Sequence, residues 1–260
     1  MKKLTKHPVL PVTLTYDPEP HTYTDDAGTA YESVTTLVKR AFPPFDAHTA
    51  ADRIAARENR LAFDVLAEWN AKRDMSATVG TFIHAHAESL VLGTPAPDIP
   101  DNFTQQMRQR ALQGVKMVDR ALSMLRPGYE LLGAEQIVFD PLFEVAGTID
   151  LPARNRKTGA LAILDWKTCE SITDDAYGQT ALPPIAHIRA SKLAHYTLQL
   201  SIYAWILTDQ IYSAYPSAGE PVELALIHLP HDAPDPVWMP VPYWPREVGA
   251  LIVAKQKGAA

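Results

Sequence analysis

The sequence predicts an α+β protein in which a central mixed β-sheet is flanked by helices and preceded by a helical lobe. Three observations lead to this prediction. Short β-prone runs open the chain, good helix formers dominate residues 47–126, and β-rich runs return after Tyr129 with one amphipathic helix among them. We expect residues 1–127 to form the β element and helical lobe and residues 128–260 the core sheet, within one integrated domain.

Composition narrows the class of protein. Of 260 residues, 47% are hydrophobic and 21% charged, and no apolar run approaches the ~20 residues of a membrane span. The first 16 residues do not have the pattern of an export signal. Cys169 is the only cysteine, which excludes an internal disulfide and an all-cysteine metal site, so we expect a cytoplasmic protein. A net charge of −6 argues against wholesale attraction to nucleic acid, although Lys and Arg cluster locally.

The first elements follow from turn and capping signals. Residues 13–40 read as short strands around a turn at DDAG, followed by a helix that Ser33 or Thr35 caps. The FPPFD stretch then breaks the chain, and two helices are expected between Ala47 and Arg73. Ser76 is expected to cap a further helix that Gly93 ends, and another helix should span residues 101–126.

Three β-rich runs at 129–140, 143–153 and 159–168 predict a meander of three strands. The polar, proline-containing residues 170–190 indicate a mobile loop or a functional lid. An amphipathic helix is expected at 192–207, and strands at 222–230 and 236–242 complete the sheet before a short helix-prone tail.

The run AILDWKT, residues 162–168, places an acid and an amine at the end of an apolar strand. Asp165 and Lys167 are two residues apart, so both side chains lie on the face that Ile163 shares. Alone, such a pair is usually a strand-end salt bridge. Asp150, at the far end of the preceding strand, could share a cation with Asp165 or simply start a turn.

Two helices carry further candidates. His84 and Glu88 are four residues apart and share one helix face, whereas His86 lies about 200° away from His84 around the axis. Gln199 and Tyr203 are also four residues apart. Each pair by itself also fits an ordinary helix surface.

Together these residues form an ordered series: Gly80-Thr81-x-x-His84-x-x-x-Glu88, Gly147-x-Ile149-Asp150, Asp165-Trp166-Lys167-Thr168 and Gln199-x-x-x-Tyr203. The series resembles the PD-(D/E)XK nuclease superfamily and, within it, the RecB-like exonuclease branch, which implies a restriction-endonuclease-like fold. It spans residues 80–207. Residues 21–46 are similar to the amino-terminal region of phage exonucleases and of the mitochondrial genome maintenance exonuclease type.

The resemblance implies a role for each matching residue. It implies that His84, Asp150 and Asp165 bind Mg²⁺ or Mn²⁺, with the carbonyl of Trp166 as a further ligand. Glu88 would complete the acidic site or orient a water, and Lys167 would hold the attacking water or balance charge on the phosphate. Gln199 and Tyr203 would position the nucleic-acid backbone or brace Lys167. Thr168 would also help to position the substrate, while Glu135 would support the ligands. Crowded carboxylates repel each other, so Asp150 and Asp165 should have raised pKa values without metal, an effect that Lys167 offsets in part.

The function that the resemblance implies is a metal-dependent DNA exonuclease acting on linear single- or double-stranded DNA in phage or bacterial recombination, repair or replication. A single-strand-annealing or recombination partner and a homo-oligomer are compatible with it, and no membrane is involved. One cysteine rules out the iron–sulfur cluster of some relatives, and no GxxxxGK[ST] motor motif occurs.

Three alternatives stay open from the sequence. His84 and His86 could belong to a zinc metallohydrolase, although imidazoles two apart on a helix diverge. The fold could also be a catalytically silent DNA-binding subunit, although the acids and the lysine are retained. Finally, the substrate could be RNA or structured DNA. The helical lobe could form an arch over the substrate.

Overall fold

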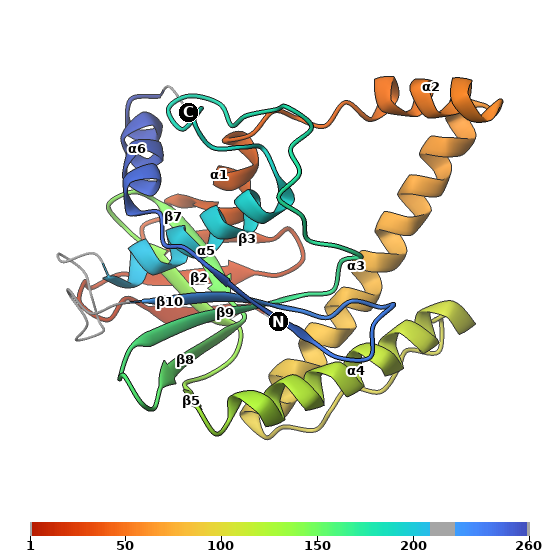
Figure 1. Cartoon of the computed structure of the whole chain (residues 1–260). Helices are drawn as coiled ribbons and strands as arrows, with labels where there is room; N and C mark the ends of the chain where they lie inside the picture. The colour runs from red at the N-terminus through yellow and green to blue at the C-terminus, as the bar shows by residue number, and fades with distance from the viewer. Residues whose placement is uncertain (1, 209–221, 259–260) are drawn as a thin grey trace.

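The computed structural model describes residues 2–208 and 222–258 and has the predicted α+β class (Figure 1). The helices are α1 Val34–Arg40, α2 Ala47–Glu58, α3 Ala62–Leu92, α4 Gln105–Leu125, α5 Lys192–Thr208 and α6 Pro245–Gln256. The strands are β1 Lys3–Lys6, β2 Thr13–Asp17, β3 Thr22–Asp25, β4 Ala30–Ser33, β5 Tyr129–Leu131, β6 Gln136–Asp140, β7 Val145–Ile149, β8 Leu151–Asn155, β9 Leu161–Lys167, β10 Glu223–His228 and β11 Val237–Val241.

These strands form two mixed sheets, where the sequence suggested one. The first has the order β1-β2-β3-β4-β7-β6 and the second β11-β10-β9-β8-β5. The predicted middle strand is divided between them, because β7 pairs with β6 in one sheet and β8 with β9 in the other. Asp150 is the single residue between β7 and β8, so it lies where the chain passes from one sheet to the next.

Strand β9 is buried on both faces, and its successive side chains point alternately into two different hydrophobic clusters. Ile163 packs in a cluster with residues of α1, α5 and α6, whereas Leu164 and Trp166 pack in a second cluster with α3 and α4. The odd-numbered positions, including Asp165 and Lys167, therefore point toward the α5 side, as the two-residue repeat predicts.

The amino-terminal β element forms as expected. Strands β2, β3 and β4 pair in antiparallel order, and β4 continues the sheet by pairing in parallel with β7. Ser33 caps α1, since its Oγ accepts a hydrogen bond from the backbone N–H of Thr36 at 3.1 Å. Strands β2, β3 and β4 thus belong to the same sheet as β7, the strand that ends just before Asp150.

The predicted helix start at Ser76 is wrong, because α3 runs without a break from Ala62 to Leu92. No glycine or proline interrupts residues 62–79, so the good helix formers on both sides of Ser76 make one helix. The predicted end is confirmed: Gly93 adopts a left-handed φ of 68°. The first half of α3 and all of α2 project from the body, as Figure 1 shows.

Residues 168–191 form no helix or named strand, and Ala181 and Ile185 among them pack in the core cluster that also holds residues of α1 and α5. They are tied to their surroundings by an ion pair of Glu170 with Lys72 of α3 and a hydrogen bond from the N–H of Leu182 to the carbonyl of Ala41 at 2.8 Å.

No helix in the described ranges is both long and apolar enough to cross a membrane.

Candidate active site

Asp150 stands at the junction of the two sheets and faces the end of β9. The register pairs Leu151 with Leu164, which places Asp150 next to Asp165 across the strands. Beyond that pair, β8 no longer supplies carbonyl partners to β9. The backbone N–H of Trp166 donates instead to Oδ2 of Asp150 at 2.9 Å, so a side-chain carboxylate continues the ladder.

Asp165 and Lys167 form a buried ion pair, with Nζ 2.6 Å from Oδ2. The same ammonium lies 4.4 Å from the ring centroid of Tyr196 and 3.5 Å from Oε1 of Gln199. Gln199 in turn donates from Nε2 to the hydroxyl of Tyr203 at 3.2 Å. These contacts hold Lys167 in place between β9 and α5.

His84 on α3 brings an imidazole to the same place. Its Nδ1 lies 3.5 Å from Oδ2 of Asp150 and 3.7 Å from Oε1 of Glu135. One ligand atom of each of these three residues lies within 4.8 Å of the other two. Glu135 precedes β6 with a left-handed φ of 48°, and its N–H donates to the carbonyl of Asp150 at 3.0 Å. Sequence reasoning gave Glu135 a supporting role, whereas the structure includes its carboxylate in the cluster.

Burial and mutual repulsion change the acid–base behaviour of the group. Burial, reinforced by the neighbouring Asp150, raises the pKa of Asp165 to about 6 against the opposing effect of Lys167. The pKa of Asp150 is also raised by burial, which His84 and Lys167 oppose. Both aspartates thus shift in the expected direction, but burial is the larger cause and repulsion between carboxylates the smaller one. Burial lowers the pKa of His84, but Asp150 and Glu135 more than compensate and raise it to about 9.

The donor set fits a hard divalent cation. Carboxylate oxygens are the preferred ligands of Mg²⁺ and Mn²⁺, and one imidazole suits Mn²⁺ better than Mg²⁺. The geometry of His84, Glu135 and Asp150 supports this fit, since three donors from α3, the residue before β6 and the β7–β8 junction meet within one ion's reach. Asp165 and Lys167 flank them on β9.

Two glycines of the sequence motifs allow helices to approach this site closely. A Cβ on Gly147 would lie 2.6 Å from Cε1 of Tyr203 and 3.1 Å from Cγ2 of Val34. A Cβ on Gly80 would lie 3.0 Å from Oγ1 of Thr168. The first contact seats α5 over β7, and the second seats α3 against the end of β9.

Other predicted residues lie beside the cluster. Glu88 is one turn beyond His84, in a groove of about 520 Å³ that His84, Glu135 and Thr168 also line. Its carboxylate lies 3.4 Å from Nζ of Lys3. His86 points toward α4, with Nε2 3.8 Å from Oδ1 of Asp119. Within the described residues, His84, Glu135 and Asp150 are the one group of three or more His, Cys, Asp or Glu side chains whose ligand atoms lie close enough to share an ion, and His86 is not in it.

A cavity of about 230 Å³ opens onto the ion pair and the cluster. Besides the predicted residues, it is lined by Tyr16 and Tyr23 of the β2–β3 hairpin and by His21 in its turn. Sequence reasoning missed these three side chains and also Tyr196. The spacing of Tyr196 from Gln199 and Tyr203, three and seven residues, would have placed it on the same helix face.

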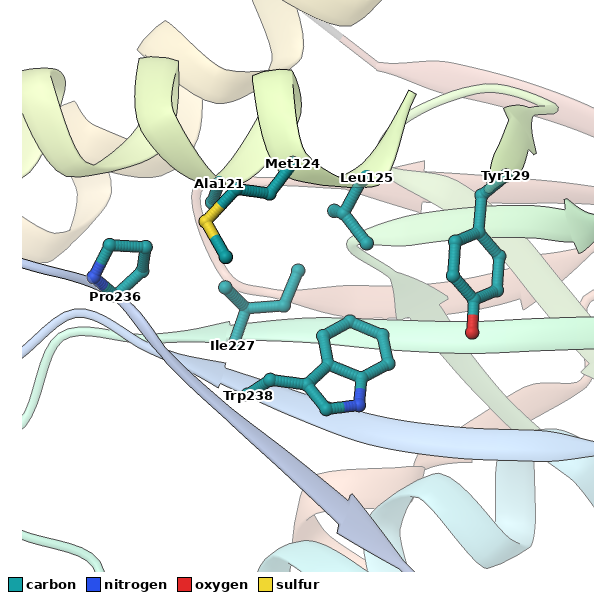
Figure 2. Close-up of a pocket in the computed structure, with 7 residues that line it drawn as sticks. All are labelled: Ala121, Met124, Leu125, Tyr129, Ile227, Pro236 and Trp238. Atoms are coloured by element: carbon teal, nitrogen blue, oxygen red, sulfur yellow. The ribbon is translucent and has the colours of Figure 1, made fainter. Parts of the chain in front are cut away.

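A second cavity, of about 270 Å³, lies under α4 and has no part in this chemistry. Figure 2 shows apolar side chains of α4 facing strands β10 and β11 across it. Its lining offers neither a carboxylate nor a basic group, and consists of Ala121, Met124, Leu125, Tyr129, Ile227, Pro236 and Trp238.

Comparison with known proteins gives limited similarity. No protein-family model matches the chain, and no curated protein matches its sequence. Among solved structures, the chain is similar to a protein from Eubacterium rectale described as "putative exonuclease", with 15% identity and a TM-score of 0.41. The similarity covers 72% of this chain and 69% of that one.

Proposed function

We propose that the chain is a divalent-metal-dependent nuclease that hydrolyses phosphodiester bonds of linear DNA from an end. The observation that carries this proposal is the meeting of His84, Glu135 and Asp150 beside the buried pair of Asp165 and Lys167. The order of the sequence motifs, and their resemblance to RecB-like exonucleases, support the same reading. A role in recombination, repair or replication follows from that resemblance.

The residues of the site have different roles in the proposed hydrolysis. His84, Glu135, Asp150 and, beside them, Asp165 would hold Mg²⁺ or Mn²⁺. A bound ion of this kind supplies a nucleophile from water at neutral pH and offsets the charge that builds on phosphorus. The chain itself fixes the orientation of Asp150 through the amide of Trp166, which keeps one carboxylate oxygen in place.

Lys167 is the group best placed to meet the substrate's negative charge. Asp165 and Asp150 keep its pKa above the ordinary value even though burial opposes protonation. The ammonium therefore stays charged and is held by Asp165, Gln199 and the ring of Tyr196. It can donate to a phosphate oxygen or to the attacking water with little loss of conformational entropy.

The projecting arm of α2 and the first half of α3 would contact DNA away from the cleaved bond. Its tip exposes Phe63 at 76% and Leu61 at 69%, and it carries several basic residues. Those basic residues are Arg53, Arg57, Arg60, Lys72 and Arg73, and the last four also pair with nearby carboxylates. We expect deletion of residues 40–75 to reduce processivity, and a folded deletion variant with unchanged processivity would refute the arm's role.

The deciding experiment compares end-labelled linear DNA, single- and double-stranded, with closed circular DNA in Mg²⁺, Mn²⁺ or EDTA. We expect metal-dependent loss of linear DNA only, abolished in Asp165→Asn and in Lys167→Met. Asp119→Asn is the matched control, because Asp119 is an exposed aspartate on α4. Cleavage of circular DNA would indicate an endonuclease, and a parallel RNA substrate tests the choice of nucleic acid. Binding without cleavage in any metal would favour the silent DNA-binding subunit.

A further inference from the structure

The β2–β3 hairpin places an aromatic cluster in the wall of the cavity that holds the candidate active site. Tyr16 and Tyr23 are cross-strand partners whose rings stack at 4.7 Å between centroids and 23° between planes. The ring of His21 lies edge-on to both, at 5.4 Å from Tyr16 and 5.9 Å from Tyr23. All three line the same cavity as Asp150, Asp165 and Lys167.

The three rings differ in what they can offer a ligand. Tyr23 is 2% exposed and belongs to the core of the hairpin, where its hydroxyl lies 3.2 Å from Oγ1 of Thr148 on β7. Tyr16 is partly exposed and His21 is exposed. Packing in the hairpin core therefore explains the presence of Tyr23. It does not explain why the exposed His21 and the half-buried Tyr16 lie beside a group of acids.

Tyr16 and His21 are also fixed before any ligand arrives. The hydroxyl of Tyr16 lies 2.9 Å from Nδ1 of His21, and the ring rests on Tyr23. Rings that are already held lose little rotational freedom on binding, which favours affinity. Glu135 lines the same cavity, and the pKa of Tyr16 is raised mainly by burial and further by the charge of Glu135.

We propose that Tyr16 and His21 form a stacking site for one unpaired nucleobase next to the bond that is cleaved. This inference rests on the proposed nuclease function and adds to it a substrate class: a single-stranded or frayed end. A base inside a duplex must leave its own stack and base pair before it can stack between protein rings, and this costs least in single strands and at frayed ends. Stacking is tolerant of sequence, since every base has a π-face, so no sequence preference is expected.

The test measures binding and cleavage on the same variants. Binding of a labelled single-stranded DNA oligonucleotide and of its blunt duplex is followed by fluorescence anisotropy in EDTA, and cleavage with Mg²⁺ or Mn²⁺. His21→Asn removes the ring at a position with φ of 54°, which asparagine tolerates. Tyr16→Leu removes the other ring, and Tyr16→Phe keeps it while removing the hydroxyl.

We expect Tyr16→Leu and His21→Asn each to weaken binding of the single strand about 10-fold, with little effect on the duplex. Tyr16→Phe should weaken single-strand binding less than Tyr16→Leu does, because it keeps the ring and loses only the contact with His21. Trp238→Leu, which removes an aromatic ring at the cavity under α4 (Figure 2), should bind like wild type. Thermal unfolding checks that each variant is folded, and His21→Asn carries the test if Tyr16→Leu is not.

Three outcomes would overturn the stacking site: unchanged single-strand binding in both variants, equal weakening for the duplex, or equal weakening in Trp238→Leu. If the wild-type protein cleaves DNA and any of these outcomes is found, the stacking site is refuted while the proposed nuclease function stands. A wild type that neither binds nor cleaves DNA would refute the proposed function itself.

Discussion

The backbone N–H of Trp166 donates a 2.9 Å hydrogen bond to Oδ2 of Asp150, and this bond joins the two sheets of the protein at the candidate active site. Asp150 is the single residue between β7 and β8, whereas Trp166 is in β9, the strand that β8 pairs with. A residue whose carboxylate we assign to metal binding therefore also completes a strand ladder. Its structural and chemical roles can be separated by substitution.

Asp150→Asn keeps an oxygen that can accept from Trp166 but removes the negative charge, whereas Asp150→Ala removes both. We expect both variants to lose cleavage activity by at least about 100-fold, given that even partners of metal ligands are worth 10–100-fold. Only the alanine variant should lose about 1–3 kcal/mol of unfolding free energy, the cost of a buried unsatisfied amide. Chemical denaturation beside a nuclease assay checks this, and equal destabilisation by Asn and Ala would contradict the assigned hydrogen bond.

Glu135 and Glu88 offer a matched pair for locating the metal. Glu135→Gln removes a carboxylate from the cluster and should weaken Mn²⁺ binding about 10- to 100-fold. Glu88→Gln removes one from the adjacent groove, where its contact is Lys3, and should leave the affinity nearly unchanged. Isothermal titration with Mn²⁺ measures both. Stronger loss in Glu88→Gln would place the ion toward Glu88, in the groove that His84 and Glu135 also line.

Gly147 tests the close contact of α5 with β7. Gly147→Ala would bring a methyl group to 2.6 Å from Cε1 of Tyr203, so we expect a loss of about 1–3 kcal/mol in stability and reduced activity. Gly249→Ala, in α6, is the control: its nearest neighbour is 3.6 Å away, and alanine should add about 0.5–1 kcal/mol. Thermal unfolding that ranks the two variants in the opposite order would contradict this packing.

Asp25, which lies outside the candidate active site, makes the stability of the fold depend on pH. Burial would raise its pKa, but hydrogen bonds from the N–H groups of Thr29 and Ala27 and from the hydroxyl of Tyr31 lower it below 3.8. A pKa lower in the folded state means that the carboxylate stabilises the fold above pH 3.8, and that this is lost as the pH falls through the folded-state pKa. Asp25→Asn should therefore melt earlier than wild type at pH 7, with a difference that shrinks at lower pH. A difference that grew on acidification would contradict this sign.

The sequence by itself determined the class of fold and much of its local detail. Turn residues and caps have short-range causes, so the hairpin, the Ser33 cap and the Gly93 stop could be predicted from neighbouring residues. The two-residue repeat of β9 likewise placed Asp165 and Lys167 on one face. The false helix start at Ser76 shows the limit of this reasoning, because a capping residue inside a run of helix formers does not interrupt the helix.

Tertiary structure alone decided what meets at the site. The division of one predicted strand between two sheets depends on pairing partners distant in sequence, and it brings Asp150 to the end of β9. Glu135 itself has a left-handed backbone conformation just before β6, and this conformation brings its side chain to the cluster. The pairing of β4 with β7 brings the hairpin that carries Tyr16 and His21 to the same site. Local periodicity records which face a side chain takes, but only long-range packing fixes which faces come together.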